Sequence, residues 1–280
     1  MAWTERQHRL LAAMGLRLLQ PPHEDAVAVA ERPAAARADE GVAVALLEPP
    51  AAPPPRPAAA AAAPVRAPVA APAPVLSAAP AGALSTLGWP ELRDAVAGCR
   101  ACGLCEKRTQ TVFGVGATQA RWMVVGEAPG EQEDREGEPF VGAAGQLLDR
   151  MLAALQLTRA DEPGTPPERQ VYIANTLKCR PPGNRNPAPD ELSKCEPFLV
   201  RQIELLRPRL ILAMGRFAVQ ALLRSDEPIG RLRGRVHQYQ GVPLVVTYHP
   251  AYLLRNLPEK AKAWDDLCFA AELFERQGGA

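Results

Sequence analysis

Four short apolar runs, separated by longer segments of helical periodicity, constrain the fold of this 280-residue chain more than any other feature. Short buried runs that alternate with 3.6-residue periodicity predict alternating strands and helices. This alternation predicts a three-layer α/β/α domain around a central, mainly parallel, four-stranded sheet. The apolar runs cover residues 121–125, 171–174, 209–213 and 244–247, and the helical patterns cover residues 143–157, 189–206, 215–223 and 259–276.

Polar or glycine residues follow each apolar run. A loop from Gly126 to Gly130 follows the first run, Asn175 the second, Gly215 comes just after the third, and His249 just after the fourth. Open α/β sheets bind ligands at the carboxyl ends of their strands, so these residues are candidates for a site. The glycine loop lacks the Gly-Lys-Ser/Thr of a P-loop and the full spacing of a dinucleotide fingerprint, which leaves a simple tight turn open as its role.

The N-terminal part of the chain differs in composition from the rest. In residues 49–80, 25 of 32 residues are Pro or Ala, so few side chains are available for burial. We therefore predict a disordered Pro/Ala-rich linker over residues 21–87 and the functional domain over residues 88–280. Residues 1–20 have helical periodicity that stops at two prolines. This pattern predicts an isolated amphipathic helix that either docks on the domain or binds a protein partner.

Charge is balanced over the whole chain and uneven along it. The formal net charge of the whole chain is only +1. The segment from Lys178 to Arg235, however, contains twelve Lys or Arg and only six Asp or Glu, and it includes the run Arg231, Arg233 and Arg235. Either a solvated basic face or a footprint on a DNA backbone fits this cluster. No run of eighteen apolar residues and no hydrophobic leader with a cleavage site occur. We therefore expect a cytoplasmic protein with no membrane association.

The six cysteines indicate a metal centre rather than disulfides. Disulfide frameworks suit short secreted chains, whereas closely spaced cysteines in the cytosol usually bind metal. The spacing fits either a structural zinc or a cubane iron–sulfur cluster. Cys268 falls in the last helical pattern, where a small buried side chain is its simplest role. The other five are Cys99, Cys102, Cys105, Cys179 and Cys195.

Four longer motifs surround these candidate residues. They are Gly126-Glu127-Ala128-Pro129-Gly130-Glu131-Gln132-Glu133-Asp134, Gly137-x-Pro139-Phe140-Val141-Gly142, Asn175-x-x-Lys178-Cys179-Arg180-Pro181-Pro182-x-Asn184-Arg185 and His249-Pro250-Ala251-Tyr252-Leu253-Leu254-Arg255. Together they resemble the family 4 uracil-DNA glycosylases. The resemblance covers about residues 99–273 and leaves the N-terminal extension unexplained.

This resemblance implies an activity and a cofactor. The activity is excision of a flipped uracil from DNA by hydrolysis of its N-glycosidic bond, which leaves an abasic site for base excision repair. The cofactor is a [4Fe-4S] cluster, with ligands that correspond to Cys99, Cys102, Cys179 and Cys195. Cys105 is then a spare thiol, and Cys102 with Cys105 is the competing pair. We expect a monomer that binds uracil-containing DNA.

The resemblance also implies roles for individual residues in the base pocket. Phe140 would stack on the flipped pyrimidine. Asn175 would read the base, because its amide can donate to O4 and accept from N3–H of uracil but not match cytosine. His249 would stabilise negative charge at O2 as the bond breaks, and Glu127 would stabilise the sugar cation and orient the attacking water.

Other implied positions concern selectivity and DNA contacts. Ala128 stands where family 1 glycosylases have an aspartate, which leaves the water-activating group open. Glu133 is a second pocket carboxylate and would exclude the thymine methyl group, since Gly130 occupies the place of a blocking tyrosine in family 1. Arg255 and the preceding residues 250–254 would enter the DNA and fill the gap left by the flipped base. The remaining expected DNA contacts are Arg185, Arg231, Arg233 and Arg235.

Three other functions compete with turnover. One related branch becomes covalently trapped on DNA through a histidine in a basic insertion, but no such insertion follows Cys195. A catalytically weak iron–sulfur protein that only binds damaged DNA is a second alternative. A nucleotide-phosphate hydrolase that uses the Gly126 loop is the third.

Overall fold

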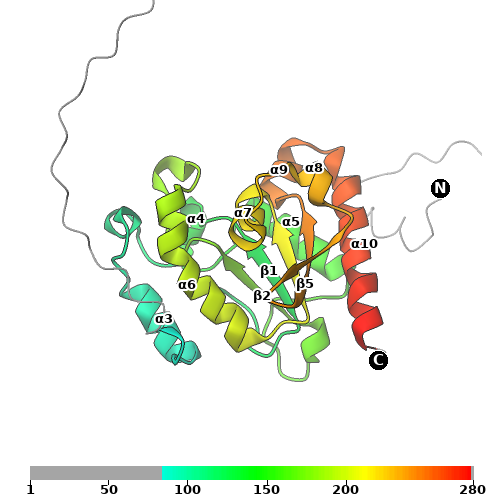
Figure 1. Ribbon diagram of the computed structural model, residues 1–280, viewed down its shortest axis with the longest axis horizontal. Coiled ribbons are helices and arrows are strands. Elements are labelled where there is room, and N and C mark those ends of the chain that lie inside the picture. Colours follow the sequence, from blue (N-terminus) through cyan, green and yellow to red (C-terminus); the bar gives the residue numbers. More distant parts are fainter. Residues whose placement is uncertain (1–83, 279–280) are drawn as a thin grey trace, which may run out of the picture. The chain divides into compact units, whose positions relative to one another are not determined.

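The computed structural model describes residues 84–278, which form an α/β domain around one five-stranded sheet (Figure 1). The sheet order is β2-β1-β3-β5-β4. The four predicted strands are confirmed as a parallel set, β1 (Trp122–Gly126), β2 (Val171–Asn175), β3 (Leu210–Met214) and β5 (Val242–Thr247). The predicted helix over residues 1–20 and residues 21–83 of the predicted linker lie outside the described residues.

The fifth strand, β4 (Val236–Tyr239), was not predicted. It pairs antiparallel with β5 at the edge of the sheet and alternates exposed and half-buried residues. An edge strand needs no continuous apolar run, because one side of its backbone and part of each face meet solvent. Its mixed sequence, Val-His-Gln-Tyr, therefore gave no signal of the kind used for the other four strands.

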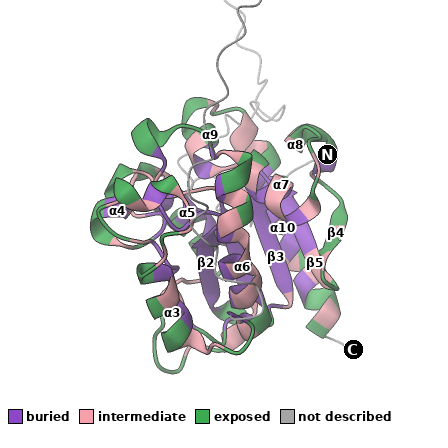
Figure 2. Cartoon of the chain, turned by 60° about the vertical axis from the view of Figure 1, so that its left-hand side comes forward, coloured by how far each residue is buried: buried purple, intermediate pink, exposed green. Residues whose placement is uncertain are grey.

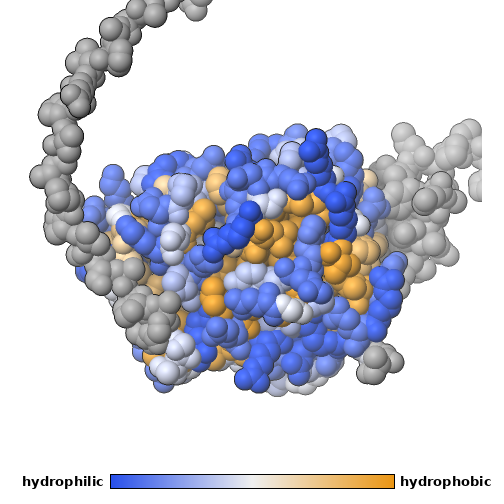
Figure 3. Space-filling model, viewed as in Figure 1, coloured by the Kyte–Doolittle hydropathy of each residue, from blue (hydrophilic) through white to orange (hydrophobic). Residues whose placement is uncertain are grey.

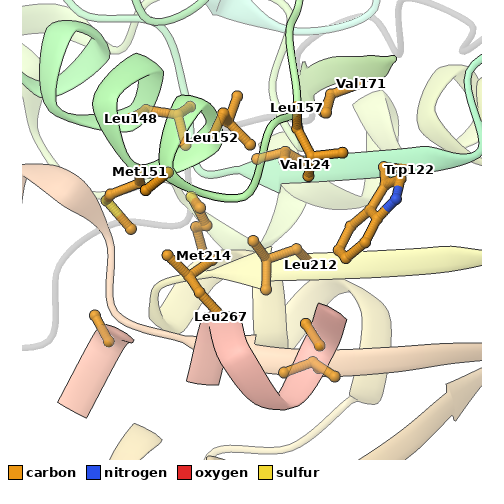
Figure 4. Packing of buried hydrophobic residues seen from close by; sticks show 14 of the residues in the cluster. Trp122, Val124, Leu148, Met151, Leu152, Leu157, Val171, Leu212, Met214 and Leu267 are labelled. Carbon is orange, nitrogen blue, oxygen red and sulfur yellow. The ribbon is translucent and has the colours of Figure 1, made fainter. Parts of the chain in front are cut away.

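Helices cover both faces of the sheet, and its four parallel strands lie almost wholly buried between them, unlike the edge strand β4 (Figure 2). Successive strand residues point to opposite faces, so Val124 packs with one layer and Val125 with the other. Figure 4 shows Leu148 and Leu267 with strand residues in the first layer. This layer contains α5 (Ala143–Ala154) and α10 (Glu259–Gly278), and the second contains α6 (Pro189–Leu206) and α7 (Arg216–Leu223).

A smaller apolar cluster lies beside the sheet, where α3 (Trp89–Ala97) packs against α6. It includes Leu92 and Phe198, and also the buried Cys179 and Cys195. Leu84 is buried in the same cluster, so packing on the domain begins a few residues before the expected boundary at residue 88. The turn η1 (Gly103–Glu106) closes this cluster with Leu104.

Short helices and turns lie at the carboxyl ends of the parallel strands, namely α4 (Glu131–Glu136), η3 (Pro182–Asn184), α8 (Ile229–Leu232) and α9 (Pro250–Arg255). The turn η2 (Pro167–Arg169) instead precedes β2, at its amino end. In Figure 1, α4, α8 and α9 lie along the same edge of the domain. Within residues 84–278, no helix is long and apolar enough to cross a membrane.

A buried ion pair fixes the edge of the sheet to the last helix. The Arg233 guanidinium lies 2.9 Å from the carboxylate of Asp266, which is 1% exposed. The Thr247 hydroxyl, at the end of β5, donates to the same carboxylate over 2.9 Å. Arg233 therefore links the segment before β4 to α10 and β5. Of the three arginines expected to contact DNA in this region, Arg231 and Arg235 are the exposed ones.

This pair generates a stability prediction. Replacing Arg233 with Met leaves the buried Asp266 carboxylate without its cation, which we expect to lower the free energy of unfolding by about 3 kcal/mol. Urea unfolding of the variant measures the change. The control, Arg231→Met, alters an exposed side chain and should change stability by less than about 0.5 kcal/mol. Equal unfolding midpoints for the two variants would show that the pair contributes nothing.

Candidate active site

A cleft of about 850 Å³ runs along the carboxyl edge of the sheet. The loops after β1 and β5, the start of α7 and the turn before α6 line it. Six of the predicted site residues are among its lining residues: Glu127, Ala128, Glu133, Arg185, His249 and Arg255. The cleft therefore lies at the carboxyl edge of the sheet, which is where the strand–helix alternation predicts a ligand site.

Asn175 and Phe140 lie together at the end of β1. Gly126 pairs with Asn175 across the parallel strands, and it has no side chain to fill the space between them. A Cβ atom at Gly126 would lie 2.4 Å from the Asn175 amide oxygen and 2.7 Å from the Phe140 ring. Glycine is therefore required by close approach, and the amide and the ring share one small space.

The side-chain amide of Asn175 has unused hydrogen-bonding capacity. The residue is 2% exposed, and its buried Oδ1 atom has no hydrogen-bond partner within residues 84–278. Leaving such a group unpaired costs about 1–3 kcal/mol. Its backbone is held instead, since Lys178 Nζ donates to the Asn175 carbonyl over 2.8 Å. A fixed backbone with an unpaired amide oxygen is suited to reading a polar ligand.

His249 faces Phe140 and is held in one tautomer. The two rings stack with centroids 5.3 Å apart and planes at 29°. The Ala251 backbone N–H donates to His249 Nδ1 over 3.2 Å, so the proton of the neutral ring is on Nε2. Burial lowers the pKa of His249 to about 4, and the nearby Arg255 adds to the shift. The imidazole is therefore a neutral hydrogen-bond donor at ordinary pH.

Glu127 is a carboxylic acid with a shifted pKa. Burial raises its pKa to about 7, so the group is partly protonated near neutral pH. Its backbone is fixed to the end of β2, because the Leu177 N–H and the Thr176 hydroxyl both donate to the Glu127 carbonyl. These backbone hydrogen bonds therefore fix the segment that carries Glu127 relative to the end of β2, where Asn175 lies.

The second predicted carboxylate has a structural contact of its own. Glu133 Oε2 accepts a hydrogen bond from the Gly130 backbone N–H over 3.1 Å, which caps the start of α4. The residue still lines the cleft. Ala128 lines the cleft as well and packs on the small cluster around α3.

The predicted DNA-contacting arginines differ in their surroundings. Arg185 lines the cleft, but its guanidinium binds both carboxylate oxygens of Glu191, at 2.6 and 2.9 Å. Arg255 is exposed at the end of α9 and also lines the cleft. Arg231, Arg233 and Arg235 are not among its lining residues.

Sequence reasoning missed two residues that line the cleft, Arg216 and Tyr248, whereas Tyr252 belongs to the stretch 250–254 that was expected to enter the DNA. Arg216 and Tyr248 come just after strand ends, which is the signal that could have found them.

Arg216 also borders a second groove of about 430 Å³ between α6 and α7. On the face in Figure 3, apolar side chains gather over α7 within a mainly hydrophilic surface. Tyr252 stacks on Tyr248 with centroids 5.2 Å apart.

Five cysteines line one small cavity beside α3 and α6, namely Cys99, Cys102, Cys105, Cys179 and Cys195. In the described part of the chain, no three metal-binding side chains are arranged closely enough to hold a single ion. The sulfur atoms do receive polar contacts. Arg108 donates to Cys179 Sγ over 3.1 Å, and the Lys178 backbone N–H donates to Cys195 Sγ over 3.2 Å.

The surroundings of this cavity fit an anionic group held by thiolates. Lys178, Lys194 and Arg108 line the cavity together with the cysteines. Burial raises the pKa of Cys179 and Cys195, and the donors and positive charges of Arg108 and Lys178 oppose that shift in favour of the thiolates. Cys268 lies instead in α10 and packs on the first layer of the core.

The comparisons with known proteins agree with this site. Residues 113–268 match the family model of the uracil DNA glycosylase superfamily. A type-4 uracil-DNA glycosylase of Archaeoglobus fulgidus is 46% identical over 164 residues, which is 56% of this chain and 78% of the relative. A type-4 uracil-DNA glycosylase of Thermotoga maritima is 39% identical over 184 residues, which is 64% of this chain and 91% of the relative. The chain therefore belongs to the type-4 family of the uracil-DNA glycosylase superfamily.

Proposed function

We propose that this protein excises uracil from DNA by hydrolysing the N-glycosidic bond and leaves an abasic site for base excision repair. The observation that carries the proposal is the buried, unpaired amide oxygen of Asn175 beside the rings of Phe140 and His249. A flat base with polar edges complements this combination of apolar faces and unused polar atoms. Family membership supports the same chemistry.

Base selection depends on the Asn175 amide. A uracil flipped out of the duplex offers an N3–H donor and an O4 acceptor on one edge. The amide can accept from N3–H with Oδ1 and donate to O4 with Nδ2, which satisfies the buried oxygen. Cytosine presents the reverse pattern, so it would leave donors and acceptors mismatched in a buried site. Phe140 supplies an aromatic face for the same base.

Bond cleavage depends on charge stabilisation at both ends of the breaking bond. The Nε2–H of neutral His249 can donate to uracil O2, where negative charge grows as the base leaves. The ionised Glu127 carboxylate can stabilise the positive sugar and orient the water that attacks its anomeric carbon. Arg255 is exposed and lines the cleft, which supports a role for its charge in binding the DNA backbone.

We also propose that Cys99, Cys102, Cys179 and Cys195 hold a [4Fe-4S] cluster. Burial raises the pKa of Cys102, Cys179 and Cys195, and the nearby Cys99 adds to each shift. The proximity of Cys99 to these three thiols supports its place in the ligand set, and Cys105 lines the same cavity as the competing ligand. The cluster would have a structural role, because it would cross-link the segment after α3, the residues after β2, and α6.

Release of free uracil from a uracil-containing oligonucleotide tests the proposed activity. The substitution Asn175→Asp tests whether Asn175 recognises the base. The variant places a carboxylate opposite uracil O4, so two acceptors face each other. We expect single-turnover excision to fall by about 100-fold or more. Affinity for DNA with an abasic site, which lacks the base, should change little. A rate within about threefold of wild type would exclude Asn175 as the reader.

Excision should rise with pH through about 7, because the active form of Glu127 is the carboxylate and its pKa is about 7. His249, with a pKa of about 4, stays neutral over this range, so it adds no second rise or fall to the pH–rate profile. Rates of single-turnover excision across pH, for wild type and Glu127→Gln, measure the effect. The variant should excise more slowly and show no rise in rate near pH 7. If the rise near pH 7 persists in Glu127→Gln, another ionisable group causes it.

The same pKa shift has an opposite effect on stability. The Glu127 pKa is raised in the folded protein, so its favourable contribution is complete below the ordinary carboxyl pKa and is lost as the pH rises to about 7. Glu127→Gln should therefore be more stable than wild type above that pH, as measured by thermal unfolding.

Purified protein should contain about four iron and four sulfide per chain. Cys99→Ser should lose most of the iron and of the visible absorbance, whereas Cys105→Ser should retain both. Cys268→Ser, in α10, is the matched control and should retain the cluster. Stoichiometric zinc without sulfide would refute the cluster, and iron loss in Cys105→Ser but not in Cys99→Ser would reassign the ligands.

A further inference from the structure

The base-stacking residue proposed above has an unusual backbone. Phe140 has φ +58°, in the left-handed region that residues with a side chain rarely occupy. A bulky residue holds this conformation only when its surroundings impose it. Phe140 is 4% exposed, and its ring lies between Gly126, Asn175 and His249. The position of the ring in the pocket therefore depends on what holds the Phe140 backbone.

The Arg159 guanidinium holds the peptide groups on both sides of Phe140. Its Nη1 donates to the Pro139 carbonyl over 2.8 Å, and its Nη2 donates to the Phe140 carbonyl over 2.9 Å. The guanidinium also pairs with Asp149 of α5, with Nη2 2.6 Å from the carboxylate. The planar guanidinium presents its donors in a fixed, spaced fork that matches two neighbouring carbonyls, and the compact ammonium of a lysine does not reproduce this geometry.

Helix α5 closes the other side of this arrangement. A Cβ atom at Gly145, in its first turn, would lie 1.6 Å from the Phe140 carbonyl oxygen. Only glycine allows the helix to approach this closely. The Phe140 carbonyl thus lies between the backbone of α5 and the Arg159 guanidinium, and the Arg159 side chain is only 17% exposed.

We propose that Arg159 is a positioning residue for uracil excision, which sets the place and tilt of the Phe140 ring against the flipped base. This inference rests on the function proposed above. The Arg159 donors are used by the Pro139 and Phe140 carbonyls and by Asp149, so we expect Arg159 to act through Phe140 rather than by contact with the base. A small misplacement of a stacking ring lowers the rate because the base no longer lies in the reactive geometry.

A purely structural arginine offers a matched control. Arg201, in α6, also donates twice to a backbone carbonyl, that of Leu87, at 2.8 and 2.9 Å. It pairs with Glu204 at 3.0 Å, and its side chain is 18% exposed. It lies away from the cleft. Arg201→Lys and Arg159→Lys therefore remove the same kind of fork at similar burial.

The experiment compares these two variants in melting temperature, single-turnover excision and inhibition by free uracil. We expect similar losses of melting temperature. Arg159→Lys should excise about tenfold more slowly and bind free uracil more weakly, while Arg201→Lys stays within about twofold of wild type in both. Affinity for abasic DNA should be unchanged in both. Equal excision rates for the two variants would overturn the proposal.

A double-mutant cycle tests whether the effect passes through Phe140. In a Phe140→Leu background, which lacks the ring, Arg159→Lys should change excision by less than about twofold. A full tenfold loss in that background would overturn the proposal, because Arg159 would then act by another route. Wild type and Arg201→Lys release uracil only if the proposed function holds, so its failure is distinguishable from failure of the inference.

Discussion

The parallel pairing of β1 with β2, in the register that places Gly126 opposite Asn175, is the constraint on which the site depends. Parallel strands end at the same edge, so residues about fifty positions apart in sequence meet there. The missing side chain at Gly126 lets the Phe140 ring and the Asn175 amide approach each other. Any side chain at this position would separate the ring from the amide, whatever the rest of the pocket contained.

The residues after β2 link this pocket to the cysteine cavity. Buried Lys178 donates to the Asn175 carbonyl and, over 2.6 Å, to Gln202 of α6. Gln202 in turn donates to the Phe113 carbonyl and to the Tyr172 hydroxyl. Lys178 also lines the cysteine cavity. A buried cation is costly without partners, so the polar network and the proposed anionic cluster together explain why it is tolerated there.

Local patterns in the sequence predicted the central strands and the residues at their ends, because these depend on the period and order of apolar residues. Asn175 and His249 were candidates on that basis alone. The edge strand β4 has no such pattern. The Arg233–Asp266 pair joins residues 33 positions apart, so the sequence placed Arg233 with the exposed arginines although its charge is buried against α10. The contacts of Arg159 with Phe140 are likewise invisible until the chain is folded.

Three residues of the pocket have conformations or surroundings that are unfavourable in the protein without substrate. Asn175 keeps a buried oxygen unpaired, Glu127 has a carboxyl group whose ionisation is opposed by burial, and Phe140 has a left-handed backbone. Each state costs stability, and the surrounding sheet and helices offset that cost. A flat base with an N–H donor would satisfy the amide, stack on the ring and bring the sugar cation to the carboxylate. The Phe140 backbone stays held by Arg159 and α5 when the base binds. The amide gains its partner on binding, whereas the carboxylate gains a counter-charge only as the bond breaks, so the Glu127 interaction is the one that favours the transition state.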